Sequence, residues 1–290
     1  MYLDNNRMIM IRKMATLVAL TLILTSCNGD GKEIKRPEIK QKTYKNLISK
    51  VERFLEKESI GENLYKYDEN NRVIEITNIQ RLNGEKVLKS AVSYSKDKIL
   101  IEEDVLPEAE SNLSAPTKHE IVLDASGKAT MQITTLCFPG GKEERRVADK
   151  FQYNKTGKQI SQKTPTFRAI ERTWANDNCI QKDQIYYPSN SSGENSSVFF
   201  FYTDKENNDT YPDLNQIWSP APSIEALFAD ELGLRSFKLL KDIEYTDTHT
   251  PAKSISYEFD SMGRVVLITV VRKSKTGKYP RSIYKISYKG

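Results

Sequence analysis

Apolar and polar residues alternate along most of the chain after residue 64. Near the C-terminus, Ile255, Tyr257 and Phe259 share one face of an extended chain, and the residues between them are polar. The segment 265–271 is almost continuously apolar. A period of two is typical of half-buried strands, and a short apolar run between turns fits a strand buried on both faces. The pattern therefore predicts an all-β fold.

A recurring turn unit separates these segments. Each copy has Asp or Asn, then about two mostly polar residues, then Gly or Asn, and then a cation. Four clear copies occupy residues 67–73, 123–128, 153–158 and 259–265, and two looser ones occupy 94–99 and 174–180. Asp or Asn accepts hydrogen bonds from the backbone that follows it, and Gly or Asn adopts the positive φ that reverses the chain. Consecutive hairpins predict a long antiparallel meander. The copies are too unevenly spaced for a propeller or solenoid.

Two segments have helical spacing instead. Apolar residues from Tyr44 to Leu55 recur every three or four positions, which predicts an amphipathic helix of about four turns that caps one end of the fold. In the second segment Ser223 is placed to cap a helix over Ile224–Leu232, with Gly233 as the stop. This short helix, set into a meander, is expected to lie across a sheet face or to plug an open end.

The N-terminus has the pattern of an export signal. Arg7, Arg12 and Lys13 precede the apolar segment Met14–Leu24, which is too short to span a bilayer. The segment then ends in Thr25-Ser26-Cys27. A short apolar core between positive charge and small residues predicts a secretory signal over residues 1–26.

Leu24-Thr25-Ser26-Cys27 resembles the lipobox of bacterial lipoproteins at all four positions. The resemblance implies that the chain is cut before Cys27 and that this residue carries two or three acyl chains, enough for stable anchoring. Asn28 follows, where the inner-membrane retention signal has Asp, which implies an outer-membrane lipoprotein, periplasmic or cell-surface facing. Residues 27–42 are interpreted as a lipidated flexible tether, and 43–290 as a single β-meander domain with the N-terminal helix.

Composition narrows the partners. Without residues 1–26 the chain has 264 residues, with 41 Lys and Arg against 38 Asp and Glu, from 44 and 39 in the whole sequence. A nearly balanced, interspersed charge gives no case for nucleic acid, which requires clustered cations on one face. The expected partners are the membrane, through the lipid on Cys27, and an unidentified glycan, lipid or envelope protein.

Residues able to carry chemistry are few. His119 and His249 are the histidines of the chain, and each is interpreted as a surface residue rather than a metal ligand or catalytic base. Glu102, Glu103 and Asp104 could supply paired carboxylates for glycoside hydrolysis, but a charge run between strands is more often solvated. No catalytic residue, cofactor or metal site is assigned.

Two further modifications are considered. Cys137 and Cys179 remain once Cys27 is lipidated, and they either form a disulfide bridge, which the periplasm permits, or stay as separate buried thiols. The tripeptide Asp260-Ser261-Met262 resembles the O-glycosylation motif of Bacteroidetes and lies in an expected turn. This resemblance implies Ser261 as the modified residue.

The chain also resembles a Bacteroidetes lipoprotein family known only as a domain of unknown function with a porin-like fold. The resemblance covers roughly residues 60–290. It rests on the lipobox, the tyrosine-aspartate-type turns, the segment Tyr202–Asn208 that leads into Asp213-Leu214-Asn215, and a Gly-Leu helix end. It implies a long antiparallel meander curled into a partly open, barrel-like sheet. It carries over no catalytic residue.

Three functions remain open. The first is a non-enzymatic, membrane-anchored module that binds a glycan, lipid or protein at the cell envelope. The second is a hydrolase with carboxylates drawn from different strands. The third is a transmembrane β-barrel, because Tyr284, Ile286 and Tyr288 resemble a terminal barrel strand. The lipid anchor and the charges on both strand faces argue against this last function, since a lipid-facing band must be apolar.

Overall fold

The fold is known from a computed structural model. It describes residues 44–290 apart from 83, 105–114, 138–143, 166, 188–194, 208, 218–222, 248 and 274–278. The predicted signal (1–26) and the predicted tether (27–42) therefore lie outside the described residues. In the part of the chain that the structure describes, no helix is long and apolar enough to cross a membrane.

The structure is built almost entirely from strands that follow one another along the chain. They are β1 (Asn46–Leu55), β2 (Glu58–Tyr67), β3 (Val73–Gln80), β4 (Lys86–Tyr94), β5 (Lys98–Asp104), β6 (Ala115–Leu123), β7 (Ala129–Cys137), β8 (Glu144–Tyr153), β9 (Gln159–Thr164), β10 (Arg168–Ala175), β11 (Asn178–Tyr186), β12 (Ser196–Glu206), β13 (Thr210–Tyr211), β14 (Lys238–Tyr245), β15 (Lys253–Phe259), β16 (Val265–Arg272) and β17 (Ser282–Tyr288), with one helix, α2 (Ile224–Leu227).

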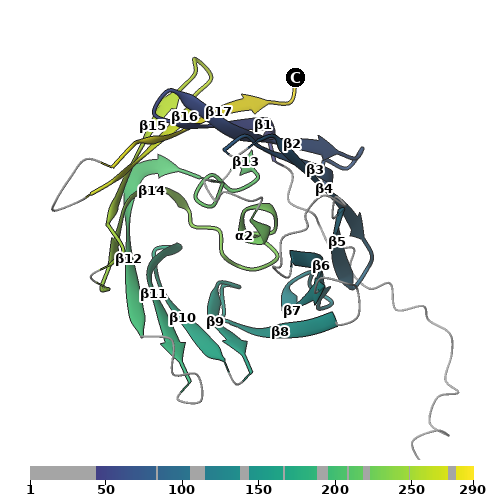
Figure 1. The fold of residues 1–290 in the computed structure, drawn as a ribbon. Coiled ribbons are helices and arrows are strands. Elements are labelled where there is room, and N and C mark those ends of the chain that lie inside the picture. Colours follow the sequence, from purple (N-terminus) through teal and green to yellow (C-terminus); the bar gives the residue numbers. More distant parts are fainter. Residues whose placement is uncertain are drawn as a thin grey trace, which may run out of the picture. The chain divides into compact units, whose positions relative to one another are not determined.

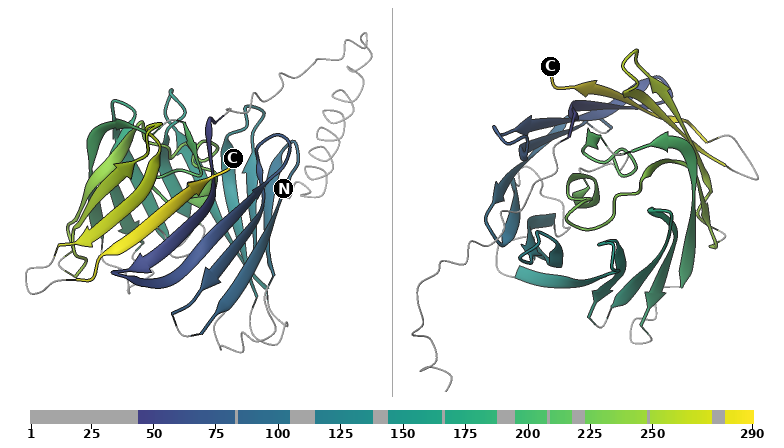
Figure 2. Two further views of the ribbon diagram at one scale, coloured as in Figure 1. Left: turned by 90° about the horizontal axis from the view of Figure 1, so that it is seen from above. Right: turned by 180° about the vertical axis from the view of Figure 1, so that it is seen from behind.

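The sheet closes on itself. Apart from the two-residue β13, each strand pairs antiparallel with the next along the chain, and β17 pairs antiparallel with β1, with Val51 opposite Ile286. The described residues thus form a closed barrel of sixteen strands (Figure 1). Figure 2 shows the same barrel from above and from behind. The prediction of a partly open sheet was wrong, because β1 and β17 satisfy each other's edges and closure leaves no edge unpaired.

The predicted N-terminal helix is also wrong, because residues 46–55 form β1. The sequence signal was misleading for a local reason. A register shift between Ile48 and Lys50 inserts an irregularity into the strand, so Ile48 and Val51, three residues apart, are both fully buried. Such a bulge gives a strand the spacing of a helix. β1 then pairs with β2 on one side and β17 on the other, which an isolated amphipathic helix could not do.

The predicted turns are confirmed in detail. In each of the four clear copies the Asp or Asn side chain accepts hydrogen bonds from the backbone N–H groups two and four residues later, at 2.8–3.0 Å. The residue before the cation has a positive φ in every copy: Asn71 (60°), Gly127 (81°), Gly157 (76°) and Gly263 (76°). All four turns lie at one end of the barrel, here called the turn rim.

A girdle of tyrosines lies just inside the turn rim. In each case the tyrosine hydroxyl donates to a backbone carbonyl near the start of the preceding barrel strand. The pairs are Tyr67 with Ile48 (2.6 Å), Tyr94 with Val73 (2.9 Å), Tyr153 with Ala129 (2.5 Å), Tyr202 with Cys179 (2.7 Å), Tyr257 with Leu240 (2.8 Å) and Tyr288 with Val265 (2.7 Å). Trp174 Nε1 makes the equivalent bond to the Gln159 carbonyl at 2.8 Å. Much of the aromatic content therefore locks neighbouring strands together.

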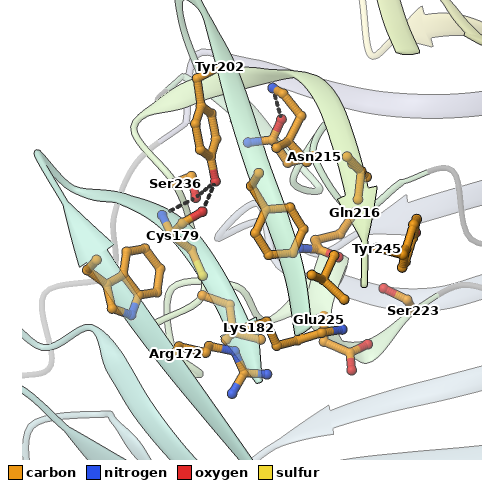
Figure 3. A pocket seen from close by; sticks show the side chains of 16 residues that line it. Arg172, Cys179, Lys182, Tyr202, Asn215, Gln216, Ser223, Glu225, Ser236 and Tyr245 are labelled. Carbon is orange, nitrogen blue, oxygen red and sulfur yellow. Dashed lines mark hydrogen bonds between the residues drawn. The ribbon is translucent and has the colours of Figure 1, made fainter. Parts of the chain in front are cut away.

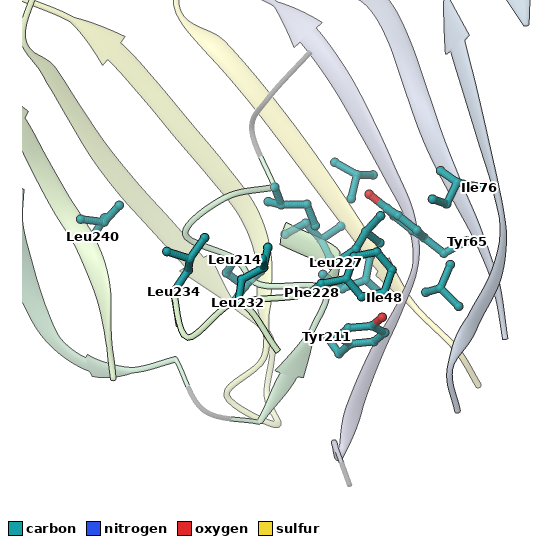
Figure 4. Packing of buried hydrophobic residues seen from close by; sticks show 14 of the residues in the cluster. Ile48, Tyr65, Ile76, Tyr211, Leu214, Leu227, Phe228, Leu232, Leu234 and Leu240 are labelled. Carbon is teal, nitrogen blue, oxygen red and sulfur yellow. The ribbon is translucent and has the colours of Figure 1, made fainter. Parts of the chain in front are cut away.

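Between β12 and β14, the described residues of the segment 207–237 (207, 209–217 and 223–237) fold back into the barrel and are called the plug. Figure 1 shows its helix α2 inside the ring of strands. Ser223 caps α2 as predicted, because its Oγ accepts a hydrogen bond from Ala226 N at 3.0 Å. Leu227, Phe228 and Leu232 are each at most 2% exposed, and they pack against apolar side chains of the strands (Figure 4).

The plug helix is shorter than the predicted Ile224–Leu232. It ends at Leu227, after which the chain continues in turns. These turns point two carbonyls of the plug at the sheet: Glu231 O accepts from Ala129 N (2.9 Å) and Gly233 O accepts from Gln159 N (3.0 Å). Carbonyls at the C-terminal end of a helix have no partner within the helix. Docking to β7 and β9 supplies partners for these two carbonyls and fixes the plug to the sheet.

We predict that Gly233→Ala loosens the plug. Gly233 has φ +65°, and a Cβ there would lie 2.5 Å from Gly157 O and 2.9 Å from Gln159 N. Both obstacles are backbone atoms, so we expect a loss of about 3 kcal/mol in the free energy of unfolding. The matched control is Gly263→Ala, where φ is +76° but no atom lies within 4 Å of the added Cβ. It should cost about 1 kcal/mol. Equal losses in denaturant titrations would contradict the packing argument.

A second prediction concerns pH. Burial raises the pKa of Glu231 in the plug to about 7. The folded state then holds this proton more tightly than the unfolded state, so stability falls as pH rises from about 4.5 to about 7. We expect the wild type to lose about 2 kcal/mol more between pH 5 and pH 8 than Glu231→Gln, measured by urea unfolding. If both proteins show the same pH dependence, Glu231 does not carry this effect.

Candidate functional site

The plug leaves part of the barrel interior unfilled. A cavity of about 280 Å³ lies between the plug and the strands β10, β11, β12 and β14 (Figure 3). Its walls combine aromatic, aliphatic, amide and charged side chains. The strands contribute Arg172, Trp174, Cys179, Lys182, Val198, Phe200, Tyr202, Leu240, Ile243 and Tyr245, and the plug contributes Asn215, Gln216, Ser223, Glu225, Leu234 and Ser236.

Part of this lining is already committed to holding the plug. Tyr202 donates to the Cys179 carbonyl and lies 3.0 Å from Ser236 Oγ. Asn215 Nδ2 donates to the Lys238 carbonyl, and its Oδ1 accepts from Leu240 N, both at 2.8 Å. These side chains have their hydrogen-bonding capacity largely satisfied, and they form a rigid back wall.

Two cations form the opposite wall. Arg172 of β10 and Lys182 of β11 lie directly opposite each other in the strand pairing. Arg172 donates to Gln159 Oε1, and its second nitrogen lies 3.4 Å from Gln162 Oε1. Lys182 makes no hydrogen bond or ion pair with any described residue. Burial lowers the pKa of Arg172, and burial followed by the nearby Arg172 charge lowers the pKa of Lys182.

Glu225 is the acidic residue of the cavity lining among the described residues. It lies in the first turn of α2, and its charge acts on both Arg172 and Lys182. It forms no ion pair within 4.0 Å in the described part of the chain. Glycoside hydrolysis by the usual route requires two carboxylates that flank the bond. The described lining therefore lacks the acid pair that the hydrolase hypothesis needs.

The acidic run proposed for that role is divided between two faces. Glu102 points outward, 58% exposed, and lies 3.6 Å from Lys118 of β6. Glu103 is its neighbour on the strand and is less exposed, and burial raises its pKa. Successive strand residues face opposite ways, so these carboxylates cannot converge. The side chain of Asp104 lies outside the described residues.

The two histidines differ. His249 is exposed in its loop, as expected. The surface assignment of His119 was wrong, because it is partly buried, with Nδ1 3.1 Å from Thr134 Oγ1, and burial lowers its pKa. The strand alternation places it on the same face as the fully buried Ile121. Among the described residues no group of three or more His, Cys, Asp or Glu is arranged to hold a metal.

The remaining predicted sites are not joined by the structure. Cys179 is buried and forms no disulfide with a described residue, and burial raises the pKa of its thiol to about 11. The side chain of Cys137, at the end of β7, lies outside the described residues, so the bridge stays a prediction. Ser261 is exposed in the turn after β15, and its glycosylation stays a prediction. Cys27 lies outside the described residues, so its lipidation stays a prediction.

Sequence reasoning missed the cation pair. The signal was present: Arg172 and Trp174 share one face of a strand, and the loose turn at 174–180 was recognised. Folding a hairpin around that turn brings residue 172 close to residue 182. Arg172 and Lys182 belong to different strands. Only the pairing register of β10 and β11 shows that these two residues lie opposite each other.

Comparison with known proteins supports the fold. The chain is similar to a porin-like protein from Bacteroides uniformis ATCC 8492, at 15% identity with a TM-score of 0.59, covering 83% of this chain and 98% of that one. A porin-like protein from Bacteroides vulgatus ATCC 8482 is 16% identical, with a TM-score of 0.49, covering 84% of this chain and 99% of that one. No family model matches the chain, and no curated protein matches it. The porin-like, all-β fold expected from the resemblance is thus confirmed as a fold.

Proposed function

We propose that this protein is a non-enzymatic binding barrel of the bacterial outer membrane, held there by lipid on Cys27, that takes a small ring-bearing ligand into its interior. The observation that carries the proposal is the partly filled barrel. The plug occupies part of the interior, and three aromatic side chains line the cavity beside it, Trp174, Phe200 and Tyr245, here called the aromatic wall. Apolar walls with a few polar groups are typical of small-molecule sites.

The size of the cavity limits the ligand. At about 280 Å³ it is close to the lower end of the usual range for ligand sites, roughly 300–1,000 Å³. A single ring with its substituents fits such a space, whereas a polymer or a protein segment does not. The aromatic side chains offer flat faces against which a sugar or aromatic ring can pack.

The outer face supports a barrel that lies outside the bilayer. Cross-strand ion pairs stand on this face, among them Lys66–Glu75 (2.7 Å), Lys118–Glu102 (3.6 Å) and Arg146–Glu120 (3.3 Å). A lipid-facing barrel carries an apolar band about 25 Å tall, and a Lys or Arg in its middle costs about 2–4 kcal/mol. The buried apolar side chains of the strands form one cluster with those of the plug. This arrangement favours a lipid anchor over a transmembrane barrel.

The anchor is tested by Cys27→Ser in the full-length chain. We expect the wild type to incorporate radiolabelled palmitate and to sediment with the outer membrane. The variant should lose the label and leave the membrane fraction after a carbonate wash, because the barrel face alone gives it no hold on lipid. If the unlabelled variant remains in the washed membranes, the transmembrane alternative is favoured.

Binding in the interior is tested by filling the cavity. Val198 lines it and is 7% exposed, so Val198→Phe places a ring in the space while keeping the site apolar. The probe is 4-nitrobenzyl alcohol, an uncharged molecule with a single ring, and its binding to the full-length protein is measured by titration calorimetry. We expect wild-type binding to weaken at least tenfold in Val198→Phe, with at most about 3 kcal/mol lost in stability.

The matched control is Ser256→Phe, which adds the same ring at an exposed position of β15. It should leave binding unchanged. Equal binding by both variants and the wild type would show that the probe does not enter the cavity.

A further inference from the structure

Cations form a row on the inner face of β10 and β11. Arg168 and Arg172 are four residues apart on β10 and therefore share a face, and Lys182 lies opposite Arg172 on β11. Arg168 Nε is buried and has no acceptor among the described residues. The Arg168 charge also acts on Lys182. Two of these positive charges, Arg172 and Lys182, line the cavity, and the charge of Arg168 acts on Lys182 from farther along the row.

Placing these cations side by side in the barrel interior is electrostatically unfavourable. Like charges directly opposite each other on paired strands destabilise the sheet, and removing a cation from water without a partner costs several kcal/mol. Glu225 is the one carboxylate in the described lining, and it forms no ion pair there. The lining that contains Arg172 and Lys182 is left with an excess of positive charge.

We propose that Arg172 and Lys182 bind the anionic group of a small ring-bearing ligand, a carboxylate, sulfate ester or phosphate ester, whose ring packs on the aromatic wall. This inference rests on the proposed function and specifies its ligand. A guanidinium presents a planar fork that matches such oxyanions, and an ammonium adds a point charge beside it. Trp174 lies two residues beyond Arg172 on the same face of β10, which sets the ring next to the charge.

Lys182 is the residue that best separates binding from structure. Arg172 is tied to Gln159 and Gln162, so its replacement disturbs neighbouring strands. Lys182 holds no described residue in place. We therefore expect Lys182→Gln to raise the unfolding temperature of the unliganded protein, because it relieves the repulsion from Arg172, and to weaken anion binding. A lysine with a purely structural role would lower the unfolding temperature when replaced.

The experiment compares three probes on the full-length protein by titration calorimetry at low ionic strength. They are 4-nitrophenyl sulfate, 4-nitrobenzoate and the uncharged 4-nitrobenzyl alcohol, each of which has a single ring and which differ in charge. We expect the wild type to bind at least one anionic probe ten times more tightly than the alcohol. Lys182→Gln should remove most of that difference. The control Lys163→Gln removes an exposed charge from the neighbouring β9 and should have no effect.

The outcomes separate the two proposals. If the three probes bind equally, or if Lys182→Gln leaves the preference for anions intact, the anion site is overturned while the binding barrel stands. If none of the probes binds, the proposed function itself fails. A fourth titration uses sodium sulfate alone. Binding as tight as that of the aryl sulfate would overturn the ring-bearing ligand and leave a site for free oxyanions.

Discussion

A closed barrel of sixteen strands encloses more space than its own side chains can fill. Barrels of about eight strands are packed solid, whereas those of sixteen or more leave a channel. In this chain the constraint is met by a segment of its own sequence, residues 207–237, which enters one end of the barrel and supplies the apolar contacts that the strands cannot make with each other. The hydrophobic core and the cavity both follow from how far this segment reaches.

The plug is held by polar contacts as well as by packing. Arg235 is 6% exposed, pairs with Asp230 at 3.0 Å and donates to the Thr210 carbonyl at 3.0 Å. Asn207 donates to the fully buried Asp213 at 2.6 Å. The Arg235–Thr210 bond joins parts of the plug that are 25 residues apart, and the other two contacts fix its local turns. Together they give an irregular segment a defined shape without regular secondary structure. Asn215 and Ser236 of the plug belong to the back wall of the cavity.

The sequence alone predicted the local chemistry of this fold better than its closure. The turns at Asp68, Asp124, Asn154 and Asp260 could be recognised because their hydrogen bonds are made within five residues. The fold of residues 46–55 could not, since a bulge gave β1 a helix-like pattern and one of its two neighbouring strands, β17, lies more than 200 residues away. The same holds for the site: Arg172 and Lys182 face each other only once the register of β10 and β11 is known. Local contacts are encoded locally, whereas closure and cavity lining depend on long-range pairing.

The pairing of β1 with β17 also bears on how the barrel is made. The two strands are the first and the last of the described chain, so the sheet cannot close until the final strand has emerged. Contacts of such high sequence separation form slowly. Until then the chain presents two unpaired strand edges, and edges of this kind recruit other chains into aggregates. Such a chain avoids this risk when it stays extended during synthesis and folds only after all its strands are available. A chain that crosses a membrane in the unfolded state meets this condition.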